Sequence, residues 1–185
     1  LPAPASELTQ IASGNAWATG GGNPSRDRAV ATSRPIGNVI VWGADLSAPP
    51  AGAPIIASGA VFIGSTDGVM HALSILDGTE LWASDVYAPV SSTASSVDGF
   101  VYVGLLDGRL IALDASTGHV VWEFKTGQSI RSSPAVVEGV LYVGSSDRRL
   151  YALDAMTGEI RWSFATGGRI TSDPSVNEHQ VIVIS

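Results

Sequence analysis

The sequence contains no cysteine, which excludes disulfide bonds, zinc–thiolate sites and catalysis by a thiol. Cations are also few, with 10 Lys and Arg against 17 Asp and Glu, and the formal net charge is −7. Nucleic-acid binding needs clustered cations that contact phosphates, so we expect neither a nucleic-acid partner nor an anionic membrane surface. No apolar run approaches the roughly 18 residues of a transmembrane helix, so no such segment is predicted.

Charged residues make up only 15% of the chain, whereas an average soluble domain has about 25%. This composition favours densely packed strands over long solvated helices, and 185 residues suit a single domain. The opening segment, residues 1–6, is rich in Pro and Ala and is typical of a linker. It would follow a removed signal peptide, join two domains or reflect where the chain was cut, and these alternatives stay open.

Four tryptophans recur at intervals of 40 residues, at Trp42, Trp82, Trp122 and Trp162. Other residue types keep the same interval, namely Pro54, Pro134 and Pro174, then Gly64, Gly104 and Gly144, then Asp67, Asp107 and Asp147. So many coincidences at one period identify an internal repeat.

The pattern within one repeat predicts strands throughout. Residues 135–144 form two short apolar runs around Glu138-Gly139, a pair typical of a hairpin turn. A second turn at 145–148 precedes a third strand at 150–154, and residues 160–164 form a fourth strand with alternating faces. Four antiparallel strands in 40 residues have the size of one β-propeller blade, so we predict an all-β propeller without helices.

Residues 112–122 and 152–162 both read Ala-Leu-Asp-Ala-x-Thr-Gly-x-x-x-Trp. They resemble the tryptophan-docking motif of the PQQ-like (quinoprotein-type) β-propeller repeat family, and the resemblance covers about residues 17–185. The first full repeat departs from the motif, with Ser74 in place of Asp and Leu-Asp-Gly at 76–78. The resemblance implies that the tryptophans stack on neighbouring blades and that the motif residues support them. The residues given this structural role are Trp42, Trp82, Trp122, Trp162, Ala112, Asp114, Gly118, Ala152, Asp154 and Gly158.

The repeat phase divides the chain into a linker and lead-in segment at 1–35 and propeller repeats at 36–185. We expect full blades at about 51–86, 91–126 and 131–166, with partial blades at 36–46 and 171–185. Because members of this family usually have seven or eight blades, the chain is expected to be part of a longer propeller. The alternatives are closure of a small ring within one chain and a homo-oligomer formed through the open blade edges.

The search for catalytic chemistry predicts no catalytic, cofactor-binding or metal-ligating residue. His71, His119 and His179 lie at different phases of the repeat, and none has a second ligand at metal-binding spacing. The recurring aspartates are explained by the turns that contain them. The family includes PQQ-dependent alcohol and sugar dehydrogenases, so a fragment of such an enzyme is the alternative function. PQQ and calcium are expected only under that alternative.

A binding surface is the remaining function, because the loops between blades and the second hairpin turns share one face of a propeller. These loops carry Tyr87, Arg131 and Arg169, residue types that are enriched at interface anchors. We therefore expect a non-catalytic scaffold or sensor module that binds a protein, a peptide or a small ligand. Members of the family that act in envelope assembly or as kinase sensor domains make a bacterial, extracytoplasmic (periplasmic or cell-surface) location the expected one.

Overall fold

The computed structural model describes residues 42–177 and 180–185. All regular elements in these ranges are β-strands, which confirms the predicted all-β class. Consequently, none of the described residues forms a helix that could cross a membrane. The predicted lead-in segment at 1–35, the start of the partial blade at 36–46, and His179 lie outside the described residues.

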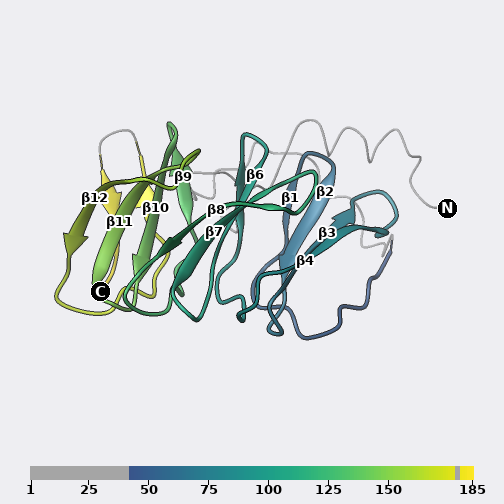
Figure 1. Ribbon diagram of the computed structural model, residues 1–185, viewed down its shortest axis with the longest axis horizontal. Coiled ribbons are helices and arrows are strands. Elements are labelled where there is room, and N and C mark those ends of the chain that lie inside the picture. Colours follow the sequence, from purple (N-terminus) through teal and green to yellow (C-terminus); the bar gives the residue numbers. More distant parts are fainter. Residues whose placement is uncertain (1–41, 178–179) are drawn as a thin grey trace, which may run out of the picture.

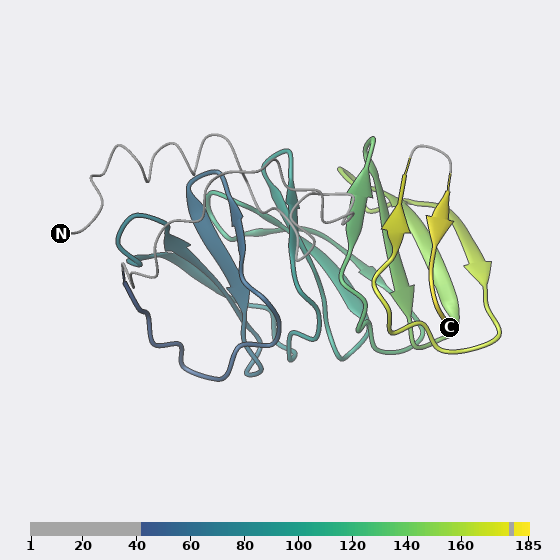
Figure 2. The ribbon, with the colours of Figure 1, turned by 180° about the vertical axis from the view of Figure 1, so that it is seen from behind.

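Three four-stranded antiparallel sheets follow one another along the chain, and each is a simple meander. The first blade contains β1 (Ile55–Ala57), β2 (Ala60–Gly64), β3 (Val69–Ser74) and β4 (Glu80–Asp85). The second contains β5 (Ser95–Val97), β6 (Phe100–Gly104), β7 (Arg109–Asp114) and β8 (Val120–Lys125). The third contains β9 (Ala135–Val137), β10 (Val140–Ser145), β11 (Arg149–Asp154) and β12 (Ile160–Ala165). The strands β13 (Ser175–Val176) and β14 (Val181–Ile182) then pair beside the third blade (Figures 1 and 2).

The first hairpin of each blade turns on two consecutive residues with positive φ. This conformation matches the two-residue hairpin turn whose twist suits the flanking strands. Gly supplies the second position of each pair at no steric cost, which explains why it recurs at intervals of 40. The pairs are Ser58 and Gly59, Asp98 and Gly99, and Glu138 and Gly139.

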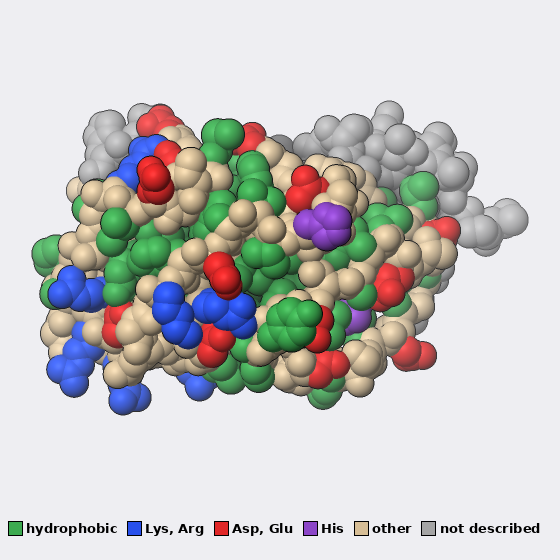
Figure 3. Space-filling view, in the orientation of Figure 1, with side chains coloured by type: hydrophobic (Ala, Val, Ile, Leu, Met, Phe, Trp, Pro, Cys, Tyr) green, Lys and Arg blue, Asp and Glu red, His purple; other side chains and the backbone are tan. Residues whose placement is uncertain are grey.

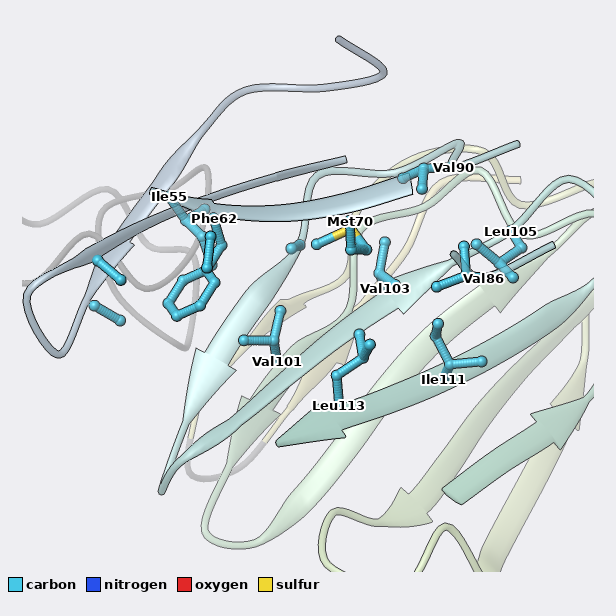
Figure 4. Close-up of a cluster of buried hydrophobic side chains, with 14 of the residues drawn as sticks. Ile55, Phe62, Met70, Val86, Val90, Val101, Val103, Leu105, Ile111 and Leu113 are labelled. Carbon is cyan, nitrogen blue, oxygen red and sulfur yellow. The ribbon is translucent and has the colours of Figure 1, made fainter. Parts of the chain in front are cut away.

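The hydrophobic core lies between neighbouring blades, where the facing sides of two sheets pack together. Figure 4 shows Ile55, Phe62 and Met70 of the first blade facing Val101 and Leu113 of the second. All five side chains are almost fully buried. An equivalent cluster fills the space between the second and third blades. Each blade therefore depends on its neighbours for its stability, as in other repeat proteins.

A chain of hydrogen bonds joins the residues that precede the innermost strands. The N–H of Ala53 donates to Oγ1 of Thr93 at 3.3 Å, and the N–H of Thr93 donates to Oγ of Ser133 at 3.1 Å. The N–H of Ser133 then donates to a carboxylate oxygen of Asp173 at 2.6 Å. Each bond spans 40 residues, so it fixes one blade to the next at the same place in the repeat.

Candidate functional site

The blades present two edges with different roles. We call the edge that carries the β2–β3, β6–β7 and β10–β11 turns and the loops between blades the loop edge. The opposite edge, with the turns at 75–79, 115–119 and 155–159, is the docking edge. The antiparallel register places Arg149 beside Ala165 at the loop edge and Leu153 beside Ile160 toward the docking edge. The loop edge lies at the bottom of Figure 1.

Three tryptophans each bind the docking edge of the following blade. The indole N–H of Trp82 donates to the carbonyl oxygen of Ala115 at 3.0 Å, 33 residues further along the chain. The N–H groups of Trp42 and Trp122 make the same bond one repeat earlier and one repeat later, to Ile75 and Ala155 at 2.9 and 3.1 Å. The geometry is thus repeated at both interfaces between full blades and at the start of the first.

Each docking turn needs a glycine for two reasons, its backbone conformation and its contact with the indole ring. Gly118 has φ +74°, and a Cβ there would lie 2.6 Å from Cε3 of Trp82. Gly158 stands in the same relation to Trp122, with φ +73° and 2.6 Å. An alanine would therefore meet both an unfavourable backbone conformation and the indole ring. Ala112 is fully buried and lies directly opposite Trp122 in the register of β7 and β8.

The aspartates of the motif hold the docking turn. Oδ1 of Asp114 accepts the backbone N–H groups of Ser116 and Thr117, both at 2.9 Å, and their hydroxyls as well. The Ser116 and Thr117 hydrogen bonds keep the pKa of Asp114 below its usual value. The guanidinium of Arg161, 2.8 Å from Asp154, has the same effect on the pKa of that carboxyl group.

The first blade reaches an equivalent turn with different residues. Ser74 replaces the aspartate, and Asp77 supplies the carboxylate from within the turn. Oδ1 of Asp77 accepts the hydroxyl of Thr79 at 2.8 Å and its N–H at 3.2 Å. Hydrogen bonds from Ser74 and Thr79 lower the pKa of Asp77. The first blade therefore keeps a carboxylate in this turn, but Asp77 supplies it in place of the residue at position 74. The sequence pattern alone did not reveal this.

Trp162 differs from the other three tryptophans. Its side chain is 42% exposed and packs beside Tyr142 of its own blade, with ring centroids 5.9 Å apart. It lines an open groove of about 770 Å³ with Phe164, Val181 and neighbouring residues, and Ala152 is its buried partner across β11 and β12.

The three predicted contact residues all lie on the loop edge, one after each full blade. Tyr87 follows β4 and is 83% exposed, and its φ of +59° is unusual for a residue other than glycine. The equivalent positions in the other loops are Gly127 and Gly167. Arg131 and Arg169 are exposed in the loops after β8 and β12. The structure thus spreads these three residues over successive blades instead of bringing them into one pocket.

Two further residues of the loop edge were not among the predicted contacts. Arg109 joins two blades, since Nη2 donates to the carbonyl oxygen of Val86 at 2.7 Å while Nε contacts Asp107, also at 2.7 Å. Arg148 is exposed and has φ +71°, although Gly68 and Gly108 occupy this turn position in the other blades. The break in the Asp-Gly pattern at Arg148 was the signal that could have identified it.

The charges are divided unevenly along the molecule. Residues 42–108 contain no Lys or Arg, and all cations of the described residues lie from Arg109 onward. In Figure 3 all visible Lys and Arg side chains lie in the left half of the view, together with some acidic ones, whereas the right half shows acidic side chains and no Lys or Arg. The loop edge therefore has a cationic region over the second and third blades and an acidic region over the first.

The histidines do not assemble a reactive site in the described residues. His71 lies in β3 and is buried, with Nδ1 2.9 Å from a carboxylate oxygen of Glu80, while its Nε2 has no hydrogen-bond partner. His119 is exposed in the docking turn of the second blade. Neither lies in a group of three or more described His, Cys, Asp or Glu side chains that could hold a metal ion.

The aspartates of the loop edge are engaged within the protein. Asp107 accepts the N–H of Arg109 at 2.9 Å in addition to the guanidinium. Asp147 accepts the N–H of Gly127 at 2.8 Å and the hydroxyl of Tyr151 at 2.7 Å, and burial together with this bond raises the pKa of Tyr151 to about 12. Calcium takes six to eight oxygen ligands, whereas Asp107 and Asp147 lie in separate turns, each with partners of its own.

Comparison with known proteins places this geometry in context. A family model described as the outer membrane protein assembly factor BamB matches residues 14–129 and 106–185. Among solved structures, BamB from Moraxella catarrhalis is 24% identical with a TM-score of 0.71, over 77% of this chain and 46% of that one. The quinohemoprotein alcohol dehydrogenase from Comamonas testosteroni is 25% identical with a TM-score of 0.68, over 88% of this chain and 29% of that one.

A computationally designed protein, Ika4, has the same fold at 17% identity, with a TM-score of 0.71 over 79% of this chain and 91% of that one. No curated protein sequence matches the chain. The chain spans about half the length of the BamB structure and less than a third of the dehydrogenase. The neighbours include both an assembly factor and an alcohol dehydrogenase, so the shared fold does not by itself decide between binding and catalysis.

Proposed function

Because this chain belongs to the PQQ-like repeat family, in the branch that the BamB model describes, we propose that it is a non-catalytic scaffold or sensor module. It binds a protein or peptide partner, or a small ligand, at the loop edge. We further propose that it works outside the cytoplasm, in the periplasm or at the cell surface. The match to an outer-membrane assembly factor supports this location, and cell fractionation with an antibody against the protein tests it.

The observation that carries the proposal is Tyr87 on the loop edge. A residue other than glycine in the left-handed region costs about 1–3 kcal/mol, and such strain is concentrated at functional positions. Here the strained residue is also a large aromatic side chain that is 83% exposed, whereas the glycines at the equivalent positions, Gly127 and Gly167, do not have positive φ. Burial of an exposed Tyr on a partner is a common source of binding energy.

Cross-linking in the cell that produces the protein tests the proposal. We expect a specific cross-linked partner for the full-length protein, and we expect its yield to fall when Tyr87, Arg131 and Arg169 are all replaced by Ala. His119→Ala and Met156→Ala are matched controls, because both side chains are exposed on the docking edge. If the triple variant folds and retains its partner unchanged, the loop edge is not the binding surface.

A fragment of a PQQ-dependent dehydrogenase is the second candidate, and the likeness to the Comamonas testosteroni enzyme over 88% of this chain supports it. Reconstitution of the full-length protein with PQQ and calcium separates the two functions. The scaffold proposal predicts no co-purifying quinone absorbance and no dye-linked oxidation of alcohols. Appearance of both signals would replace the scaffold by the enzyme.

A further inference from the structure

We propose that the loop edge of the second and third blades binds an extended acidic segment of a partner protein. The inference rests on the proposed binding role of this edge and adds the chemistry of the partner. Six cations lie on this part of the edge, at Arg109, Lys125, Arg131, Arg148, Arg149 and Arg169. They come from neighbouring turns and loops, so together they form a cationic strip two blades wide.

Half of these cations have no partner among the described residues. The side chains of Arg131, Arg148 and Arg169 are exposed and make no hydrogen bond or ion pair with the residues that the structure describes. Arg109 is already paired with Asp107 and Glu123, at 2.7 and 3.1 Å, and these ion pairs hold its guanidinium in a fixed position at one end of the strip. The unpaired guanidinium groups are free to bind carboxylates, for which their planar donor geometry is well suited.

Backbone strain marks the loop edge at two places. Five described residues other than glycine have positive φ, and three of them belong to the repeated hairpin turns described above. The remaining two are Tyr87 and Arg148, both exposed on the loop edge. In the other blades a Cβ at the position of Arg148 would approach a carbonyl oxygen, at 2.9 Å from Ala88 for Gly68 and 2.6 Å from Gln128 for Gly108. The protein thus places a cation where the repeat otherwise excludes any side chain.

Tyr87 connects the strip with the rest of the edge. The carbonyl oxygen of Val86, immediately before Tyr87, accepts a hydrogen bond from the guanidinium of Arg109, so Tyr87 follows directly on the residue that binds the first cation of the strip. An exposed aromatic side chain on the same edge as several guanidinium groups suits a peptide that carries both apolar and acidic side chains. It would be less useful for an inorganic anion.

The acidic region of the same edge limits the class of partner. Asp45, Asp67 and Asp85 lie over or before the first blade, where the described residues contain no cation to offset them. A long polyanion such as nucleic acid, or an anionic membrane laid across the edge, would meet these carboxylates as well as the strip. A short acidic segment confined to the second and third blades avoids that repulsion. The repulsion from the first blade also fixes the orientation of the segment on the edge.

Binding of a defined peptide to the full-length protein tests the inference. The probe is a fluorescein-labelled peptide of alternating Glu and Tyr residues, and the measurement is fluorescence anisotropy. We expect the peptide to bind, the Gln-for-Glu peptide to bind at least about tenfold more weakly, and affinity to fall as salt is raised, since screening weakens exposed ion pairs. Equal affinity for both peptides would overturn the inference.

Matched variants locate the binding site. Arg148→Glu and Arg161→Glu change the net charge equally and both alter exposed residues of the third blade, but Arg161 is paired with Asp154 at the docking edge. Arg148→Glu should weaken the peptide at least about fivefold and Arg161→Glu by less than about twofold. Equal effects would show attraction by overall charge alone and would contradict the proposed site.

Arg148→Gly provides a variant whose folding is not in question, because Gly is the residue that the other blades use in this turn. It should lose peptide affinity without losing its cooperative unfolding transition. Tighter binding of phosphatidylglycerol vesicles or of single-stranded DNA than of the Glu peptide would also overturn the inference. Failure of peptide binding with an intact cross-linked partner rejects only the acidic segment, whereas loss of both rejects the binding role itself.

Discussion

The docking edge and the loop edge are built on the same strands, yet they differ in how closely the repeat is followed. At the docking edge, Trp42, Trp82 and Trp122 make equivalent hydrogen bonds of 2.9, 3.0 and 3.1 Å to the following blade. At the loop edge, Tyr87 and Arg148 replace glycine, and the charge changes sign along the molecule. Residues that keep the period therefore hold the blades together, and residues that break it are candidates for binding.

The two edges also differ in how their polar groups are satisfied. The carboxylate of Asp114 is enclosed by hydrogen bonds from its own turn, which leaves it little capacity for a ligand. The guanidinium groups of Arg131 and Arg169 make no bond to the described residues. A repeated contact with every partner in place is typical of structural support, whereas exposed and unpaired cations suit recognition of another molecule.

The largest effect is expected from removing a docked indole. Trp122→Ala should lower the free energy of unfolding by about 3–5 kcal/mol, because it leaves a cavity between two blades. It also removes one of the two hydrogen bonds to the carbonyl oxygen of Ala155, the other being donated by the hydroxyl of Tyr102. Trp162→Ala is the matched control and should cost less than about 2 kcal/mol, since that side chain is already 42% exposed. Urea denaturation of both variants measures the difference, and equal losses would show that docking contributes no stability.

Two glycines separate backbone strain from steric contact. Gly139 and Gly158 have nearly the same φ, +71° and +73°, but a Cβ at Gly139 has no atom within 4 Å, whereas one at Gly158 meets Trp122. Gly139→Ala should cost about 1 kcal/mol through its backbone conformation. Gly158→Ala should cost an additional 1–3 kcal/mol or so, as expected for an overpacked contact. Similar unfolding midpoints for the two variants would contradict the close fit of indole and turn.

A smaller effect is expected from the hydrogen bonds that join the inner strands. Ser133→Ala removes the acceptor for the N–H of Thr93 at a buried site and should lower the free energy of unfolding by about 1 kcal/mol. Hydrogen exchange of the Thr93 amide provides a local reading, because that amide should exchange faster in the variant. Unchanged protection of the amide would mean that the bond to Ser133 is not what orders this segment.

The smallest effect is a pH dependence from the docking turns. The folded state lowers the pKa of Asp114, so its contribution to stability is present above the unfolded value near 4 and is lost as pH falls through the folded value. Asp114→Asn should therefore unfold with a weaker dependence on pH between about 2 and 5 than the unchanged protein. Parallel curves for the two proteins in acid denaturation would show that this carboxylate does not couple to folding.

Much of the fold could be predicted from the sequence, because the period of 40 residues and the turn pairs determine the strands directly. The pairing of each Trp with a turn 33 residues later could be inferred only through the family resemblance, since spacing alone does not show which blade face an indole meets. The role of Asp77 was missed because its carboxylate accepts the hydrogen bonds of the turn from a different position in the motif.

The loop edge was predictable as a surface but not in its details. Tyr87, Arg131 and Arg169 could be selected because loop positions and residue type are visible in the sequence. The strain at Tyr87 and Arg148 depends on φ angles that the sequence does not state, and the role of Arg109 depends on a contact with the preceding blade. The absence of Lys and Arg from residues 42–108 is visible in the sequence, but the place of the remaining cations on one edge depends on the arrangement of the strands.

The division of roles between the two edges is tested most directly by measuring unfolding and peptide binding together for Arg148→Gly. The free energy of unfolding should stay the same or rise by up to about 1 kcal/mol, because glycine relieves the strained backbone at φ +71°. Affinity for the acidic peptide should fall in the same variant. A loss of stability of more than about 1 kcal/mol, with peptide affinity unchanged, would make Arg148 a structural residue and contradict the assignment.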